Sequence, residues 1–226
     1  MSLWKKLYGV IWGSPAKTMG QIVERPRFWG AAAVMLIISL LLSLPILPKI
    51  REATIWSLQN AAGGVKMTAA QIDSIANYAV YSTPVLSALI PFLLWLVIAA
   101  LLKLFNAFTG DKAPFKAFFA IVVFSYLPVF IEGIIKTPLI MATSSQKMAH
   151  ITISLALFLP PPDAIPGKMY VFLSQLDPFL IWSLALTALG ASIAMKVSIK
   201  KTGIYLGSLW LVFALALTLL SGRTPS

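Results

Sequence analysis

Long apolar runs separated by short polar segments dominate the pattern of this chain. A helix needs about 20 predominantly apolar residues to cross about 30 Å of hydrocarbon, and five segments meet that requirement. These segments run roughly over Phe28 to Leu47, Pro84 to Phe108, Phe115 to Lys136, Pro178 to Met195 and Gly203 to Leu220. The pattern therefore predicts an all-α, polytopic membrane protein with five transmembrane helices.

Helix-start signals precede three of the five segments. The pairs Thr83-Pro84 and Asp177-Pro178 each place a side-chain oxygen before a proline at the first helical position. Asp111 together with Pro114 stands before the third segment in the same way. These signals support the segment boundaries independently of hydropathy.

The polar segments outside the spans also carry helical patterns. Thr68 and Gln71 form a capping box, which predicts a separate short helix to about Ala79 that covers the outer end of the bundle. We interpret residues 28–221 as a single five-span domain, residues 1–27 as a cytoplasmic amphipathic segment and residues 222–226 as a short tail.

The N-terminal segment shows a helical apolar stripe opposed by two lysines. The stripe consists of Leu3, Trp4, Leu7, Val10 and Ile11, and the lysines are Lys5 and Lys6. This arrangement is typical of a helix that lies in the membrane interface, with Trp4, Lys5 and Lys6 at the membrane surface. A second short helix begins at Ser14-Pro15. The alternative is that both helices pack on the bundle itself, and the sequence leaves the two interpretations open.

Composition agrees with the membrane class and restricts the chemistry. Hydrophobic residues make up 59% of the 226, only 11% are charged, and the mean hydropathy is +0.88. Cysteine is absent, and there are one histidine and seven acidic residues. We therefore expect no metal site, no cofactor and no catalytic constellation, so that the protein is not an enzyme.

The basic residues indicate an orientation. The formal net charge is +11, but the cations are spread between the apolar spans and form no stripe that would favour nucleic acid. Short basic loops mark the cytoplasmic face, and one side of the predicted bundle carries Lys5, Lys6, Lys17, Arg25, Arg27, Lys103, Lys112, Lys116, Lys196, Lys200 and Lys201. The other side carries fewer cations over longer loops: Lys49, Arg51, Lys66, Lys136, Lys147, Lys168 and Arg223. This distribution predicts a cytoplasmic N-terminus and a C-terminus outside.

Three stretches together resemble a known family. They are SPAKTMGQIVERPRF, GDKAPFKAFFAIVVFSYLPVF and LDPFLIWSLALTALGASIAMKVSIKK, in this order along nearly the whole chain. They resemble the short bacterial branch of the Yip (Ypt/Rab-interacting) domain membrane proteins. In the third stretch, Asp177, Phe179, Trp182 and Gly190 fall at the positions of the family pattern.

The resemblance implies a five-span helical bundle in a cell membrane, the inner membrane for a bacterial member. The resemblance also points to the eukaryotic Yip proteins, which look like adaptors in vesicle traffic. They engage small GTPases through a long cytosolic N-terminal region that contains an Asp-Leu-Tyr-Gly-Pro motif. Here that region is about 27 residues, and its nearest match is KLYGV, from Lys6 to Val10. The resemblance thus implies a scaffold or adaptor that acts through lipid or protein partners.

A transporter of a small solute or ion, or a lipid-moving protein, is the alternative function. Pro91 and Pro128 interrupt two adjacent spans, and each deprives a carbonyl four residues earlier of its helical donor. Broken helices near the membrane midplane are where transporters bind their substrates. Counting along the third span from its cytoplasmic end places Ser125 and Tyr126 near that level.

Glu132 and Lys136 are the ionisable residues of the third span. At a rise of about 1.5 Å per residue, Glu132 lies about 24 Å from Lys116, and Lys136 lies near the outer boundary. Their spacing and order place them on one helical face in the favourable direction for an ion pair. They are either a structural ion pair or, for Glu132, a proton or cation site.

The fifth span carries a close-contact motif. Gly203 and Gly207 are spaced as in GxxxG helix pairs. They predict close packing within the bundle or, as the alternative, contact with another membrane protein or a second copy of the chain.

Overall fold

The computed structural model describes residues 2–60, 67–109, 112–160 and 167–221. All secondary-structure elements of these described residues are helices. They are α1 (Leu3–Ile11), α2 (Pro15–Glu24), α3 (Trp29–Ser43), η1 (Leu44–Ile46), α4 (Leu47–Gln59), α5 (Ala69–Asn106), α6 (Phe115–Ser125), α7 (Leu127–Ala142), η2 (Ser145–His150), η3 (Leu155–Phe158), α8 (Lys168–Ser174), α9 (Pro178–Met195) and α10 (Ile199–Leu220). The predicted tail at 222–226 and the predicted cap residue Asp111 lie outside the described residues.

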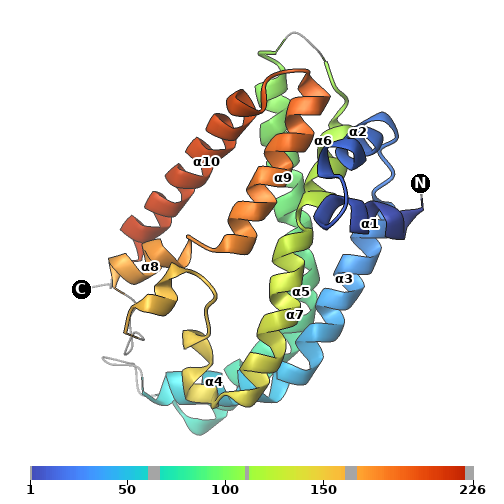
Figure 1. Cartoon of the computed structure of the whole chain (residues 1–226). Helices are drawn as coiled ribbons and strands as arrows, with labels where there is room; N and C mark the ends of the chain where they lie inside the picture. The colour runs from blue at the N-terminus through green and yellow to red at the C-terminus, as the bar shows by residue number, and fades with distance from the viewer. Residues whose placement is uncertain (1, 61–66, 110–111, 161–166, 222–226) are drawn as a thin grey trace.

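The prediction of an all-α fold with five membrane-spanning helices is confirmed. Five helical stretches within the described residues are long and apolar enough to cross a membrane. They are Trp29–Gln59, Ala69–Asn106, Phe115–Ala142, Pro178–Met195 and Ile199–Leu220. Figure 1 shows them as a staggered bundle, with α4 at one end and the α9–α10 connection at the other.

The prediction that a helix begins at Pro84 is wrong. The capping box of Thr68 and Gln71 is present, but the helix that it begins continues as α5 through Pro84 and Pro91 to Asn106. No separate cap helix therefore forms there. The Thr83 hydroxyl donates to the carbonyl of Ala79 at 2.7 Å, and α4 packs along this half of α5. Such side-chain bonds and helix contacts make prolines tolerable inside membrane helices.

The other four predicted spans can be compared with the structure by where they begin and end. The first span continues through η1 into α4, and the third extends past Lys136 to Ala142 with a break at Tyr126. The fourth span agrees with the prediction, since Asp177 caps α9 and Pro178 is its first residue. The fifth span begins at Ile199, one turn earlier than predicted.

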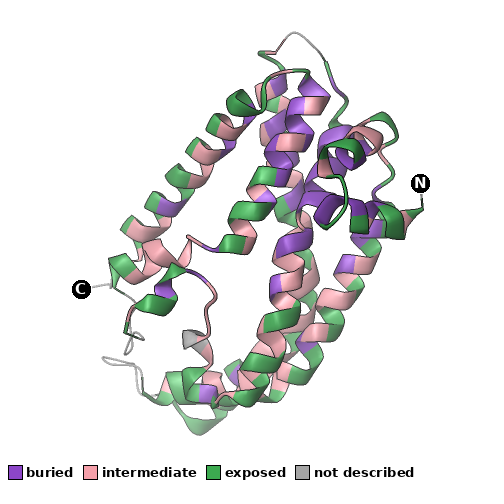
Figure 2. Ribbon diagram, viewed as in Figure 1, coloured by how far each residue is buried: buried purple, intermediate pink, exposed green. Residues whose placement is uncertain are grey.

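Helix α6 forms the centre of the protein. Every residue from Ala117 to Ser125 is buried, because α2, α5 and α9 all pack against this short helix. Figure 2 shows the buried residues concentrated where these helices meet, whereas α10 is mostly exposed or intermediate. The core is therefore offset toward the end of the bundle that carries the N-terminal helices.

The helices α1 and α2 form a hairpin that packs on this core. Val10, Met19 and Ile22 are completely buried, and α2 contacts both α6 and α9. A Cβ atom on Gly9 would lie only 2.4 Å from the Thr18 hydroxyl, so glycine is what allows the two helices to approach. The structure thus follows the second of the two interpretations of the N-terminal segment, in which the helices pack on the bundle.

The end of the bundle near α4 is held by polar contacts between distant segments. Arg51 on α4 forms a salt bridge with Asp73 on α5, and the Arg51 Nε donates to Asn77 at 3.3 Å. The Ser145 hydroxyl donates to Glu52, and Lys49 donates to the carbonyl of Thr143 at the end of α7. These contacts tie α4 to α5 and to the segment after α7.

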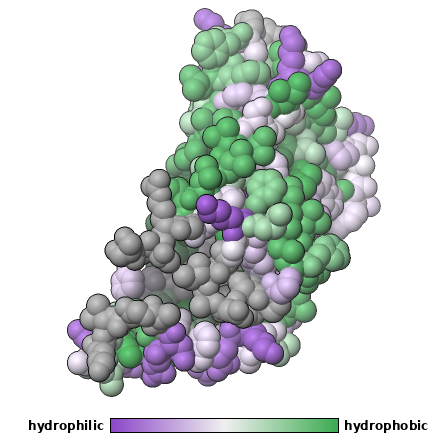
Figure 3. Space-filling model, turned by 90° about the vertical axis from the view of Figure 1, so that its left-hand side faces the viewer, coloured by the Kyte–Doolittle hydropathy of each residue, from purple (hydrophilic) through white to green (hydrophobic). Residues whose placement is uncertain are grey.

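The surface between the two polar ends is apolar. Figure 3 shows one such face, where most side chains in the middle of the molecule are hydrophobic and hydrophilic ones gather mainly at its ends, with one small hydrophilic group near the centre. Large exposed side chains on this surface include Val85, Leu89 and Leu93 on α5 and Val212 and Phe213 on α10. Such a band is expected for a protein whose helices face lipid.

Candidate functional site

A groove of about 340 Å³ opens between α3, α5 and α7. It combines aliphatic side chains with an unusual number of hydroxyl groups and one ammonium group. The lining residues are Ser39, Leu42, Ser43, Ile46, Thr83, Ser87, Pro91, Tyr126, Val129, Phe130, Gly133, Lys136, Thr137 and Ile140. The groove lies within three of the five apolar spans, and it contains three of the residues that the sequence singled out: Pro91, Tyr126 and Lys136.

Most groove hydroxyls are bonded to carbonyl groups of their own helices. The Ser43 hydroxyl donates to Leu40 at 2.6 Å, and the Thr137 hydroxyl donates to Gly133 at 2.9 Å. The Ser87 hydroxyl donates to Pro84 at 2.8 Å and lies 3.4 Å from the carbonyl of Ser39 on α3. The groove wall is therefore polar in composition, but much of its hydrogen-bonding capacity is used within the protein.

The third span breaks at Tyr126, which ends α6 and precedes α7. Its backbone N–H donates to the carbonyls of Val122 and Val123 at 3.0 and 3.3 Å, which is typical of a tightened helix end. Pro128 lies in the first turn of α7, where a missing N–H is tolerated. Pro128 therefore starts a helix after the break and does not interrupt a continuous one. Pro91 instead lies inside α5, as predicted.

Buried polar atoms without partners lie around this break. Ser125 and Trp95 are fully buried, and neither the Ser125 hydroxyl nor the Trp95 Nε1 has a hydrogen-bond partner among the described residues. The Trp95 ring packs edge-on against Tyr126, with centroids 5.6 Å apart. An unpaired buried polar atom costs about 1–3 kcal/mol, and neither Ser125 nor Trp95 lines the groove.

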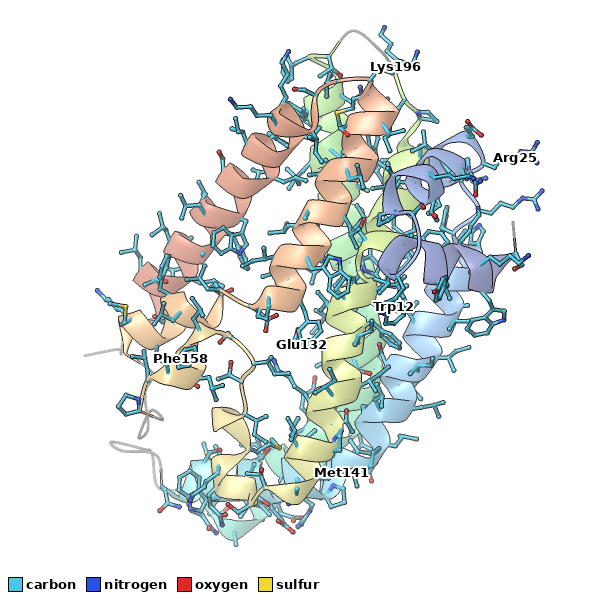
Figure 4. All side chains as sticks on the ribbon, in the orientation of Figure 1. Trp12, Arg25, Glu132, Met141, Phe158 and Lys196 are labelled. Atoms are coloured by element: carbon cyan, nitrogen blue, oxygen red, sulfur yellow. The ribbon has the colours of Figure 1, made fainter. Side chains whose placement is uncertain are left out.

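Glu132 and Lys136 form the ion pair that their spacing predicts. Glu132 is 9% exposed, and Lys136 reaches the groove wall. Figure 4 places Glu132 on α7, between the end of α1 and the end of the helix near Met141. Helix α7 continues past Lys136 to Ala142, and the depth of the pair in the bilayer stays a prediction.

A second carboxylate acts on this pair. Asp177 is buried at the start of α9, and it is close enough to Glu132 to interact with it electrostatically. One oxygen of Asp177 accepts the backbone N–H groups of Phe179 and Leu180 at 2.8 and 3.2 Å. Asp177 therefore caps α9 and at the same time adds negative charge beside Glu132.

The remaining family-pattern residues lie along α9. Phe179 is half-buried and Trp182 is exposed at 36%, so Trp182 lies on the outer surface of the helix. Gly190 is buried, and a Cβ atom there would lie 2.6 Å from Ile121 on α6 and 3.3 Å from Met19 on α2. Gly190 therefore allows three helices to meet at one point.

The outer face of α1 carries a row of exposed aromatic residues. Trp4, Tyr8 and Trp12 recur every fourth residue and are 69%, 63% and 66% exposed, which places them on one side of the helix. Lys5 is exposed beside them. The sequence grouped Trp4 with the apolar stripe, but Leu3, Leu7, Val10 and Ile11 face the bundle without it.

Lys6 does not lie at the surface where the sequence placed it. It is 7% exposed, and its ammonium group lies 5.9 Å from the centroid of the Phe124 ring. Burial and, to a smaller extent, the positive charge of Arg27 lower the pKa of Lys6. A cation–π contact of this kind partly offsets the loss of hydration, which explains how a lysine can face the bundle.

The described residues contain no group of three or more His, Asp or Glu side chains that could hold a metal ion. The groove offers hydroxyl groups, one ion pair and aliphatic surface, which suit non-covalent binding. Sequence reasoning missed the hydroxyls of α3 and α5, although the pairs Ser39/Ser43 and Thr83/Ser87 recur at one-turn spacing and were a usable signal.

Comparison with known proteins gives one family. The model of the Yip1 domain matches residues 8–220, which include the groove, the ion pair, Asp177, Gly190 and most of the N-terminal hairpin. No curated protein and no solved structure matches the chain.

Proposed function

Because this chain belongs to the Yip1 domain family, we propose that it is a multi-pass membrane scaffold that acts by binding lipid or protein partners without covalent chemistry. The family is not known as one of enzymes. The observation that carries the proposal is the row of Trp4, Tyr8 and Trp12 on α1. The opposite face of α1 is fixed on the core, so that the aromatic row is presented on a rigid support.

Aromatic residues on a fixed helix suit an interaction surface. Tryptophan and tyrosine are enriched among the residues that dominate binding energy and at membrane interfaces. The neighbouring cations Lys5, Lys17, Arg25 and Arg27 are exposed, which favours an acidic partner surface or anionic lipid around it. The hairpin of α1 and α2 is therefore the part of the molecule that we propose engages partners.

Substituting the aromatic row tests this function. We expect the triple variant Trp4→Gln, Tyr8→Gln, Trp12→Gln to lose at least about tenfold in the partner recovered by crosslinking in native membranes. The core face of α1 is unchanged, so the variant should melt close to the wild type. Trp56→Gln, on exposed α4 at the other end of the bundle, is the control. If the triple variant and the wild type recovered equal amounts of partner, the aromatic row would not be the partner-binding surface.

The orientation that we propose has the N-terminus in the cytoplasm and the C-terminus outside, in the cell membrane. Because the chain has no cysteine, single cysteines can report on it directly. We expect Gln59→Cys to react with an impermeant thiol reagent added outside intact cells, and Lys201→Cys to react only after permeabilisation. Both positions are exposed in the structure. Labelling of position 201 in intact cells would show the opposite orientation.

Movement of a small solute or lipid is the second candidate function, supported by the groove beside the break at Tyr126. For a scaffold, we expect purified protein in liposomes to show no solute flux or lipid scrambling above empty vesicles. Flux that disappears in Tyr126→Phe would favour the transporter, because that change removes only the groove hydroxyl. Tyr81→Phe, at a position 78% exposed on the same helix as Pro91, is the matched control.

A further inference from the structure

A second groove, separate from the hydroxyl-lined one, lies between the beginnings of α3 and α6 and the middle of α5. It has a volume of about 380 Å³, within the range of small-molecule sites. Five aromatic rings line it: Phe28, Trp29, Phe92, Phe115 and Phe119. Phe119 is the centre of this cluster, with ring centroids 4.7 Å from Phe28 and 6.0 Å from Phe92.

The rim of the groove is exposed at the protein surface. Trp29 is 69% and Phe115 is 40% exposed, whereas Phe28 and Phe119 form a buried floor. The groove lies at the ends of two of the membrane-spanning stretches, which begin at Trp29 and Phe115. In a bilayer, an aromatic surface at such a position is in contact with the upper part of lipid acyl chains.

The mouth of the groove is positively charged. Lys116 is the only charged residue among the described residues that line it, and the exposed Arg27 directly precedes Phe28. The helices α3 and α6 both begin here, with Phe28 and Pro114 as N-cap residues and without a side-chain hydrogen bond to the cap. The first N–H groups of a helix and its positive dipole end favour an anion, and the described residues that line the groove include no acidic side chain to compete for it.

We propose that this groove is a binding site for one anionic phospholipid. Its acyl chain lies over the aromatic floor of Phe28 and Phe119, and its phosphate lies at Lys116 and the starts of α3 and α6. A lipid with a net negative charge suits this site better than a zwitterionic one, because Lys116, Arg27 and two helix N-termini face the same headgroup level. This site shares Arg27 with the cations around the aromatic row on α1, but the proposal does not rest on the scaffold function.

Photo-crosslinking of wild-type protein locates the lipid. The full chain is placed in nanodiscs of phosphatidylcholine and phosphatidylglycerol in equal amounts, with a trace of either lipid carrying a photoreactive acyl chain. We expect the phosphatidylglycerol probe to label the segments around Trp29 and Phe115 preferentially, and the phosphatidylcholine probe to label them less. Even labelling over the exposed faces of α5 and α10, or equal labelling by both probes, would overturn the proposal.

Two variants test separately how the positive charge and the open groove contribute to lipid binding. Lys116→Gln should weaken phosphatidylglycerol binding to the detergent-solubilised protein roughly fivefold, while Lys201→Gln, the same charge change on exposed α10, should leave it unchanged. Leu96→Trp keeps the charge but fills the groove, and should abolish the groove crosslink. Equal effects of the two lysine changes, or competition by inorganic phosphate as strong as that by the lipid, would contradict a phospholipid site.

Discussion

Replacing Gly190 with leucine is expected to destabilise the protein strongly. A Cβ atom at this position would lie 2.6 and 3.1 Å from two side-chain carbons of Ile121, and 3.3 Å from the Met19 sulfur. Helix α9 would have to move away from α6 and α2 at once. Overpacking of a core costs about 1–3 kcal/mol, and we expect the melting midpoint in detergent to fall by roughly 5–10 °C.

A matched control and a rescue make this prediction specific. Gly203→Leu introduces the same side chain in α10, where no atom lies within 4 Å of the added Cβ, so it should leave the midpoint unchanged or raise it slightly because leucine is the better helix former. Ile121→Ala removes the two atoms that block position 190 and should recover part of the loss in the double variant. A Gly190→Leu protein as stable as the wild type would contradict close packing here.

The space around Gly203 and Gly207 shows whether the GxxxG motif of α10 is closely packed within the chain. The sequence favoured close packing of Gly203 and Gly207 inside the bundle, but neither has an atom within 4 Å of its missing side chain. Contact with a second copy or another membrane protein therefore stays a proposal. A change of oligomeric state in the Gly203→Leu control would support it.

The number of spans was predictable because apolar length is a direct requirement of the bilayer. Asp177-Pro178 also marked the start of α9 correctly, since that cap uses only neighbouring residues. Thr83-Pro84 carries the same local signal yet lies inside α5. What differs is the surroundings: α4 packs against that half of α5, and contacts from distant segments decide whether a helix continues through a proline.

The candidate site was predictable only where its residues share one helix. The pairing of Glu132 with Lys136 followed from their spacing. The groove and Asp177 did not, because they require the relative positions of α3, α5, α7 and α9. The burial of Lys6 was also missed, since the sequence treats a lysine as exposed and does not show that the Phe124 ring lies beneath it.

Replacing Lys136 with methionine is expected to cost more stability than replacing Glu132 with glutamine. Without Lys136, the carboxylate of Glu132 keeps its unfavourable interaction with Asp177 but loses its salt-bridge partner. Breaking a buried pair by removing one partner costs about 3–5 kcal/mol, and Lys136→Met should approach that range. Glu132→Gln removes the carboxylate that acts on Asp177 and leaves the Lys136 side chain, which is 28% exposed, so this variant should lose only about half as much.

The double variant Glu132→Gln, Lys136→Met should be more stable than Lys136→Met alone, because it removes the stranded carboxylate together with its partner. Melting of the wild type, both single variants and the double variant in the same detergent gives the coupling between the two residues as a double-mutant cycle. Additive losses in the cycle would contradict the structural ion pair. A double variant that is fully stable but loses partner binding or flux would instead make Glu132 a proton or cation site, since stability and function would then depend on different properties of the same carboxylate.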